Sequence, residues 1–485
     1  MSATQPIISN TTNINSYQDY LEQLLISHQE TLHGENQSLI VSLSQTITEV
    51  DPLCILEFLT SENNKNFSPG EVYFYWQNPV KDEAILGYGV TESCQLNVTN
   101  RFSQSKQFIK DCFQKIKRVN QDNFSSSVPY IFCGFTFFSD TSKLDFPFSP
   151  AFAFLPRLQI VQKNEQNLLF FNLLINSRTD IKKLVRQTIA NIELITKIQV
   201  NTNFNKPIQN TLNLTADQGM SHDFKSSVTS VLKSIKSNNF QKLVLANALD
   251  LTFSQEFSIV HCLERLRVHH PNCYIFAINN GKNNCFVGAS PERLISLKDS
   301  KLYTEALAGS TSRGNTKQED YYLAQNLLKS SKDRREHQVV IEYIVQCLIS
   351  LGLSPQISPL KILKLANIQH LWTPIYTQLS HDVHPLDVVA KLHPTPAVSG
   401  FPTQVACEEI KRYESFERGF YAAPLGWIDQ NGNSEFIIGI RSALISKNRA
   451  RLYAGAGIVQ GSEPEKELAE IQLKFQALLK ALSDC

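Results

Sequence analysis

The amino-acid sequence predicts a large fold that contains both β-sheet and α-helix, and three observations support this. The chain has 485 residues, 42% of them hydrophobic and 19% charged, so it can bury a large core as ordinary soluble proteins do. Short apolar runs typical of strands lie within residues 1–215. After them, strand-like runs alternate with segments of helical periodicity.

Five apolar stretches in the first part of the chain predict strands, and the polar segments between them predict loops. Two of them, "EVYFYWQNP" and "AILGYGV", lie within residues 71–90, and the others are residues 129–138, 152–161 and 167–175. A helix is expected at residues 218–238, where apolar positions recur at helical spacing.

We therefore divide the chain into a polar N-terminal part, residues 1–215, and a C-terminal part, residues 216–485, which holds the chemically informative motifs. No repeat or low-complexity linker marks the boundary, so one large unit and two domains both remain open.

Two charged residues flank predicted strands of the C-terminal part. Lys242 directly precedes the apolar strand 243–251, a position where a lysine is usually exposed. Residues 283–297 predict a strand, a turn and a second strand, which places Glu292 on the turn. A carboxylate on a turn is usually just solvated, so neither residue indicates a site by itself.

Glycines and one arginine indicate a place where the backbone approaches a ligand. The stretch "EALAGSTSRG" predicts a loop around Gly309, because glycine permits close backbone approach. Arg441 falls within the apolar strand 436–445, where a buried cation requires an anion. A glycine turn at Gly455 follows and offers backbone N–H groups to the same kind of anion.

The segment 331–349 predicts a helix with a carboxylate on its buried side. Val340, Ile344 and Cys347 form that side, and Glu336 falls in the same sector. A buried carboxylate needs a partner. A salt bridge to an arginine is the simpler interpretation, and a metal ion is the alternative.

The C-terminal stretch "GSEPEKELAEIQLK", residues 461–474, has helical spacing and raises the same question. Glu467, Glu470 and Lys474 lie on one line at the border of its apolar stripe rather than opposite it. An intrahelical Glu–Lys pair, worth only a few tenths of a kcal/mol, is the simpler interpretation. The alternative is that Glu467 and Glu470 converge with Glu336 on one Mg²⁺, which prefers carboxylate oxygens.

Composition excludes several classes of function. A formal net charge of +1 leaves no electrostatic footprint for nucleic acid or anionic membranes. Ten cysteines without a CxxC pair or zinc-ligand spacing indicate reduced thiols. No Lys or Arg precedes Lys65, and no apolar run approaches a membrane span of about 20 residues, so we expect a cytoplasmic protein.

Nine motifs occur in the order typical of the chorismate-utilising enzymes, and the chain resembles that family. They are "KLVLA", "SPE", "ALAGSTSRG", "REH", "HLWT", "HPTPAVSGFP", "IR", "AGAGIV" and "EPEKELAE", and they cover residues 220–480 densely. The resemblance implies an α+β fold in which two large antiparallel β-sheets pack on each other with helices on the outside. It also implies that the whole chain builds this fold.

Within the family, Lys242 together with "LHPTPA" resembles the isochorismate synthases. The ammonia-using anthranilate and aminodeoxychorismate branches typically lack this lysine, so no glutaminase subunit is expected. The resemblance implies Mg²⁺-dependent conversion of chorismate to isochorismate, an isomerisation. Salicylate synthase, which also eliminates pyruvate, is the alternative. The long polar N-terminal part favours a menaquinone or phylloquinone role over a siderophore role.

The resemblance also implies a role for each candidate residue. Lys242 is the base that activates water, and Glu292 is the acid that protonates the departing hydroxyl. Glu336 and Glu470 bind Mg²⁺, with Glu467 reaching it through water. The implied substrate-binding residues are Gly309, His370, Ala397, Arg441, Gly455 and Lys474.

Overall fold

The computed structural model describes residues 14–483 with internal gaps. The gaps are residues 35–36, 49, 62–63, 65–66, 68–69, 97–98, 121–127, 141–145, 164–165, 199–211, 214–218 and 367. The predicted boundary after residue 215 lies outside the described residues. The described strands form one hydrogen-bonded network of 21 strands.

The long strand β6 (Ala151–Lys163) is the point at which the sheet divides into two ladders. One edge of β6 pairs with β3, and the other pairs with β5 near its start and with β7 near its end. The first ladder is antiparallel throughout. It runs through β3 (Glu83–Leu96), β2 (Val72–Asn78), β10 (Tyr274–Asn280), β11 (Asn284–Ser290), β20 (Ser442–Ser446), β21 (Arg449–Val459) and β9 (Lys242–Phe253), whose far edge carries β8 (Leu212–Asn213) and β17 (Gly400–Phe401).

The second ladder leaves β6 on its other edge and is also antiparallel. A side branch from β6 ends in a parallel pair, β1 with β4. The ladder runs through β5 (Tyr130–Phe135), β18 (Pro424–Asp429), β19 (Ser434–Ile438), β12 (Arg293–Lys298), β13 (Lys301–Ser312) and β16 (Ile368–Gln378), with β14 (Gln356–Ile357) and β15 (Lys361–Lys364) beyond; the branch holds β7 (Gln166–Asn176), β1 (Ser38–Ile47) and β4 (Ile116–Asn120).

The two ladders pack face to face. Phe74 of β2 stacks on Phe132 of β5 with 4.5 Å between ring centroids, although β3 and β6 separate these strands along the network. The Tyr274 hydroxyl on β10 donates to Glu435 on β19 across the same interface. The expected α+β fold with two large sheets is confirmed, and the sheets are joined through β6. Strands from both parts of the chain pair directly, as β2 does with β10.

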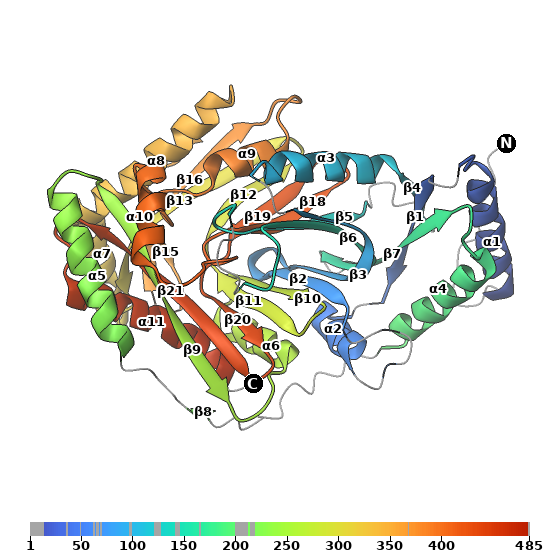
Figure 1. Cartoon of the computed structure of the whole chain (residues 1–485), viewed down its shortest axis with the longest axis horizontal. Coiled ribbons are helices and arrows are strands. Elements are labelled where there is room, and N and C mark those ends of the chain that lie inside the picture. The colour runs from blue at the N-terminus through green and yellow to red at the C-terminus, as the bar shows by residue number, and fades with distance from the viewer. Residues whose placement is uncertain are drawn as a thin grey trace.

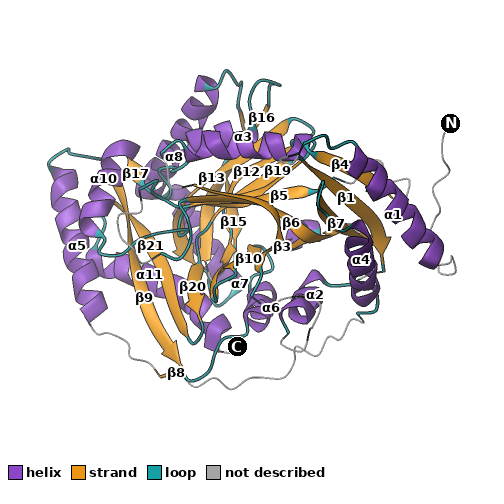
Figure 2. Cartoon of the chain, turned by 45° about the vertical axis from the view of Figure 1, so that its right-hand side comes forward, coloured by secondary structure: helices purple, strands orange, loops and turns teal. Residues whose placement is uncertain are grey.

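Helices cover the outside of the two ladders (Figures 1 and 2). α1 and α4 lie at one end of the molecule, and α5, α7, α8 and α11 lie at the other (Figure 1). The helices are α1 (Ile14–Glu30), α2 (Pro52–Thr60), α3 (Arg101–Gln114), α4 (Ile181–Thr196), α5 (Gly219–Lys236), α6 (Ile259–His269), α7 (Lys317–Lys329), α8 (Ser331–Ser350), α9 (Pro385–Leu392), α10 (Thr403–Tyr413) and α11 (Pro464–Ser483), and a 3₁₀ turn, η1, spans Pro79–Lys81. None of the helices described has the length and apolar character to cross a membrane.

The sequence prediction placed β2, β3, β5, β6 and β7 of the first part correctly but missed its strands β1, β4 and β8 and its helices. In α1, Tyr17, Leu21 and Leu25 are buried at a spacing of four residues, and polar residues surround them. The polar composition concealed this stripe, so the expectation of polar loops alone between the strands was wrong.

The helices near the later motifs form as expected. α8 begins after Ser330, whose hydroxyl caps the helix by accepting from the Asp333 amide. The apolar stripe of α11 is buried through Ile471, Phe475 and Leu478. Helix α8 packs on β13 of the second ladder, and α11 packs on β21 of the first ladder. The acidic residues of both helices lie along the edge that faces these strands.

Candidate active site

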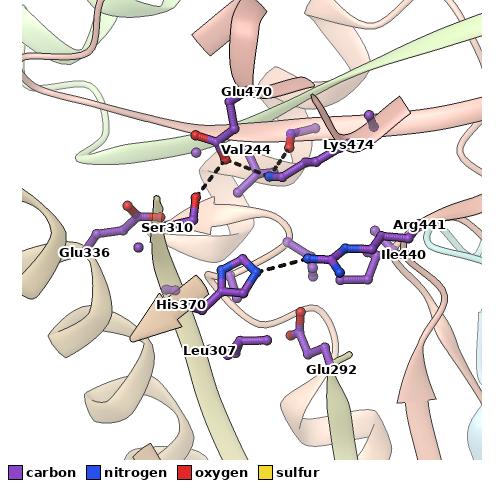
Figure 3. A pocket seen from close by; sticks show the side chains of 18 of the residues that line it. Val244, Glu292, Leu307, Ser310, Glu336, His370, Ile440, Arg441, Glu470 and Lys474 are labelled. Atoms are coloured by element: carbon purple, nitrogen blue, oxygen red, sulfur yellow. Dashed lines mark hydrogen bonds and ion pairs between the residues drawn. The ribbon is translucent and has the colours of Figure 1, made fainter. Parts of the chain in front are cut away.

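A cavity of about 200 Å³ lies between the ends of the two ladders and helices α8 and α11. This size suits a small metabolite. Ten of the eleven predicted site residues line the cavity: Glu292, Gly309, Glu336, His370, Ala397, Arg441, Gly455, Glu467, Glu470 and Lys474. The eleventh, Lys242, lies directly behind the lining residue Glu336. Figure 3 shows how the side chains surround this space, with Glu470 and Lys474 on one side and Glu292 on the opposite side.

Lys242 is the first residue of β9 and is buried, not exposed as a lysine at a strand start usually is. Its side chain is 3% exposed, and Nζ lies 2.8 Å from Glu336 Oε1. The two atoms are close enough for an ion pair, although no hydrogen bond of acceptable geometry reaches Nζ. A Cβ added at Gly457 would lie 2.7 Å from Glu336 Oε1 and 3.1 Å from Lys242 Cε. Gly457 therefore provides the space for this pair.

A buried ion pair holds the strand that carries Lys242. β17 covers the free edge of β9 only at its first two residues. Beyond them, Glu414 Oε1 accepts a hydrogen bond from the Ala246 amide at 2.8 Å, and Arg418 Nη2 donates to the Val244 carbonyl at 2.9 Å. Glu414 and Arg418 also bind each other. The pair thus satisfies backbone groups that a neighbouring strand would otherwise satisfy.

Glu292 lies on the predicted turn between β11 and β12, and it is 6% exposed. Burial, followed by the charge of Glu305, raises the pKa of Glu292 to about 8, although Lys242, Lys474 and Arg441 act in the opposite direction. Glu292 is therefore mostly protonated near neutral pH and can donate a proton.

The expected loop at Gly309 was wrong, because the segment is the strand β13 with a bulge. The register with β16 shifts between Ala308 and Ser310, and Gly309 has a φ of 75°. A Cβ at Gly309 would lie 3.1 Å from Asp333 Cβ on α8. Ser310 Oγ donates to Glu470 Oε1 on α11 at 3.2 Å. The bulge therefore allows β13 to pack closely against both α8 and α11.

Arg441 was predicted inside a strand, but it lies between β19 and β20 with a left-handed φ of 49°. Burial lowers the pKa of His370, and the charge of Arg441 lowers it further, so the imidazole is neutral. His370 Nε2 lies 3.1 Å from Arg441 Nη2 and accepts from it. Arg441 Nη1 is buried and has no hydrogen-bond partner among the described residues. A donor left open in this way suits an anionic ligand.

Gly455 was expected on a turn, but it lies inside β21. Its carbonyl accepts a hydrogen bond from Lys474 Nζ at 2.8 Å. Lys474 also donates to Glu470 Oε1 at 2.7 Å. The intrahelical pair that the sequence offered as the simpler interpretation does form. Burial would raise the pKa of Glu470, but Lys474 and Ser310 hold that pKa below its ordinary value.

Glu467 is buried at the edge of the cavity, where Lys332 Nζ lies 3.3 Å from its Oε1. Burial raises the pKa of Glu467. Lys332 and the cavity residue Asp333 were missed by the sequence analysis. Both precede Glu336 on α8 by one helical turn, so projection of this helix could have identified them.

The three predicted metal ligands share one cavity, but each is paired with a lysine. Glu336 pairs with Lys242, Glu467 with Lys332, and Glu470 with Lys474. Within the described part of the chain, no three His, Cys, Asp or Glu side chains lie at a spacing that would hold a metal ion. The assignment of these carboxylates to a metal stays a prediction.

A family model described as "chorismate binding enzyme" matches residues 26–483. The chain belongs to the chorismate-binding enzyme family. A relative in this family, isochorismate synthase MenF of Bacillus subtilis, is 32% identical over 457 residues, which cover 92% of this chain and 94% of the relative. The salicylate biosynthesis isochorismate synthase of Pseudomonas aeruginosa is 42% identical over 263 residues, or 54% of each chain.

The fold of this chorismate-binding enzyme is also similar to a solved structure. MenF, the menaquinone-specific isochorismate synthase from Escherichia coli, matches with a TM-score of 0.74 and 27% identity over 96% of this chain and 99% of the other. Anthranilate synthase component I from Streptococcus pneumoniae matches with a TM-score of 0.59 at 17% identity, which shows a shared fold alone.

Proposed function

We propose that this chorismate-binding enzyme is an isochorismate synthase that converts chorismate to isochorismate. The observation that carries the proposal is a buried, protonated carboxyl, Glu292, on the wall of one small cavity, with the buried Lys242 directly behind the lining residue Glu336. Relatives along nearly the whole chain carry the name isochorismate synthase, which supports the same assignment.

The reaction exchanges one hydroxyl position for another without oxidation or reduction. Water adds at C2 of the ring, the ring double bonds shift, and the C4 hydroxyl leaves. Lys242, acting as the neutral amine, takes the proton from the attacking water, and Glu292 gives its proton to the departing hydroxyl. One water enters and one leaves, and Lys242 ends with the proton that Glu292 has lost. The pKa of about 8 that burial gives Glu292 keeps this proton in place at neutral pH.

The substrate carboxylates are bound by the cationic and backbone groups of the cavity. Arg441, whose Nη1 is open, binds the enolpyruvyl carboxylate with the backbone of Gly455. Lys474 and the Gly309 backbone bind the ring carboxylate. His370 and Ala397 line the ring pocket.

The carboxylates of the cavity fit Mg²⁺ by their chemistry, because hard oxygen donors are the ligands that this ion prefers. Asp333 also lines the cavity, and its pKa is raised by burial and, more weakly, by the charge of Glu336. Such crowded carboxylates favour a cation. Glu336 and Glu470 would hold the ion, with Glu467 as a further ligand. When bound, Mg²⁺ supplies positive charge that compensates the substrate carboxylate.

The remaining features of the proposal concern partners and location. Chorismate is the proposed small-molecule substrate, and we propose that the enzyme works in the cytoplasm without a glutaminase subunit, nucleic acid or membrane. We also keep the proposed division into an N-terminal part, residues 1–215, and a catalytic part, residues 216–485.

The test is an assay of purified protein with chorismate and Mg²⁺, with products separated by chromatography and with ammonium present or absent. We expect isochorismate to form reversibly, with little pyruvate or salicylate and no effect of ammonium. Stoichiometric pyruvate would instead indicate a salicylate synthase. Anthranilate or aminodeoxychorismate as the main product would refute the proposal.

A further inference from the structure

A second buried carboxylate lies behind the cavity and is attached to the turn that carries the acid. Glu305 on β13 is 7% exposed and does not line the cavity. Its Oε1 accepts a hydrogen bond from the backbone amide of Arg293 at 3.1 Å, and its Oε2 accepts from Trp372 Nε1 at 2.8 Å. Arg293 directly follows Glu292, so Glu305 anchors the chain just after the acid.

Two other contacts fix the same turn from other elements. The Glu292 amide donates to Ser290 Oγ at 3.2 Å, and the Glu292 carbonyl accepts from the Ile438 amide at 3.1 Å. These contacts hold the amide and the carbonyl of Glu292. Glu305, from a different strand, holds the N–H of the same Glu292–Arg293 peptide whose carbonyl Ile438 binds.

The negative charge of Glu305 has a second effect, because it raises the pKa of Glu292. Apart from burial, the largest charge effects on the pKa of Glu292 come from Glu305, Lys242, Lys474 and Arg441, and the Tyr421 hydroxyl is a further titratable group coupled to Glu292. The three cations favour loss of the Glu292 proton, and Glu305 opposes them. The Arg293 guanidinium is also near enough to feel the charge of Glu305, but its ion pair is with Glu435 on β19 at 3.9 Å, and it is held against Tyr274 and Tyr303.

We propose that Glu305 is a positioning residue for the proton donor. It fixes the Glu292 turn through the Arg293 amide, and its negative charge keeps the proton on Glu292 until the hydroxyl departs. This inference rests on the proposed role of Glu292 in the isochorismate synthase reaction.

The test is the Glu305→Gln substitution, which keeps the length of the side chain and removes its charge. We expect the alkaline limb of the pH profile of kcat/KM to move down by about one pH unit, the order expected for one neighbouring charge. If the wild-type pKa is about 8, the protonated fraction of Glu292, and with it kcat/KM, then falls about fivefold at pH 8 and changes little at pH 6.

Trp372→Phe is the matched control. A glutamine has one acceptor oxygen for the two donors that Glu305 satisfies, and this control removes one donor without changing charge. We expect the alkaline limb of kcat/KM in Trp372→Phe to lie at the same pH as in the wild type. In the double variant Trp372→Phe with Glu305→Gln, we expect it to lie at the lower pH found for Glu305→Gln alone. Equal losses at pH 6 and pH 8 in Glu305→Gln, or a shift of the same size in Trp372→Phe, would overturn the proposal.

Infrared difference titration of the substrate-free protein separates this proposal from the proposed function. The band of the protonated carboxyl that is missing in Glu292→Gln reports the Glu292 proton without any turnover. We expect this band to disappear at lower pH in Glu305→Gln than in the wild type. An unchanged titration refutes the role of Glu305 even if isochorismate forms. A shifted titration in a protein that forms no isochorismate supports it and refutes the function.

Discussion

Replacing Glu292 with glutamine should change the pH dependence of stability as well as activity. The folded-state pKa of Glu292 is raised by burial from 4.5 to about 8. Between these values the folded state keeps a proton that the unfolded state releases, so this stabilisation is complete below pH 4.5 and is lost as pH rises to 8. From pH 6 to pH 8 the loss covers two pH units at 1.36 kcal/mol each, or about 3 kcal/mol.

The glutamine variant lacks this titration, and the other titrating groups are common to both proteins. We therefore expect the free energy of unfolding of Glu292→Gln, relative to wild type, to rise by about 3 kcal/mol between pH 6 and pH 9. Urea unfolding followed by tryptophan fluorescence at several pH values measures this difference. A relative stability that stays constant within about 1 kcal/mol would refute the burial-driven pKa and, with it, the protonated acid.

Further substitutions test the other roles. Lys242→Gln should lower the single-turnover rate by about 10² to 10⁴, as expected for loss of a general base, while equilibrium binding of chorismate is retained. Arg441→Ala should raise KM, because its contact is made in the ground state as well as in the transition state. Glu470→Gln should weaken Mg²⁺ binding in titration calorimetry, because a charged ligand is lost. Gly457→Ala should lower kcat, because its methyl group would lie 2.7 Å from the Glu336 carboxylate and displace the ion pair.

Control variants and contrary outcomes are available for these changes. Lys411→Gln removes a surface lysine whose side chain is 47% exposed, and Gly34→Ala adds a methyl group at ordinary contact distance, so both should retain activity. A Lys242→Gln protein that forms isochorismate within about tenfold of wild type would contradict the base assignment. Unaltered Mg²⁺ affinity in Glu470→Gln would exclude that residue as a ligand.

The sequence determined which segments form the elements near the site. Period and composition located the strand after Lys242, the turn at Glu292, and the helices of Glu336 and Glu470. These are local properties, because side-chain spacing decides which residues share a face of a helix or strand. The order of the motifs also predicted the family, which the comparisons confirm.

Backbone conformation at the site depended on the tertiary structure. Gly309 lies on a strand bulge rather than a loop, Gly455 lies inside a strand, and Arg441 takes a left-handed conformation between two strands. A glycine in the sequence is compatible with a turn, a bulge or close packing, and only the neighbouring elements select one of them.

Contacts and charge states were also decided only in three dimensions. The pairing of Lys242 with Glu336 joins a strand to a distant helix, and the attachment of Glu305 to the turn of Glu292 joins two strands. Periodicity shows which residues share a face of one element, but it does not show which faces meet. The proton on Glu292 depends on burial and on charges brought together by folding, so no local pattern in the sequence could determine it.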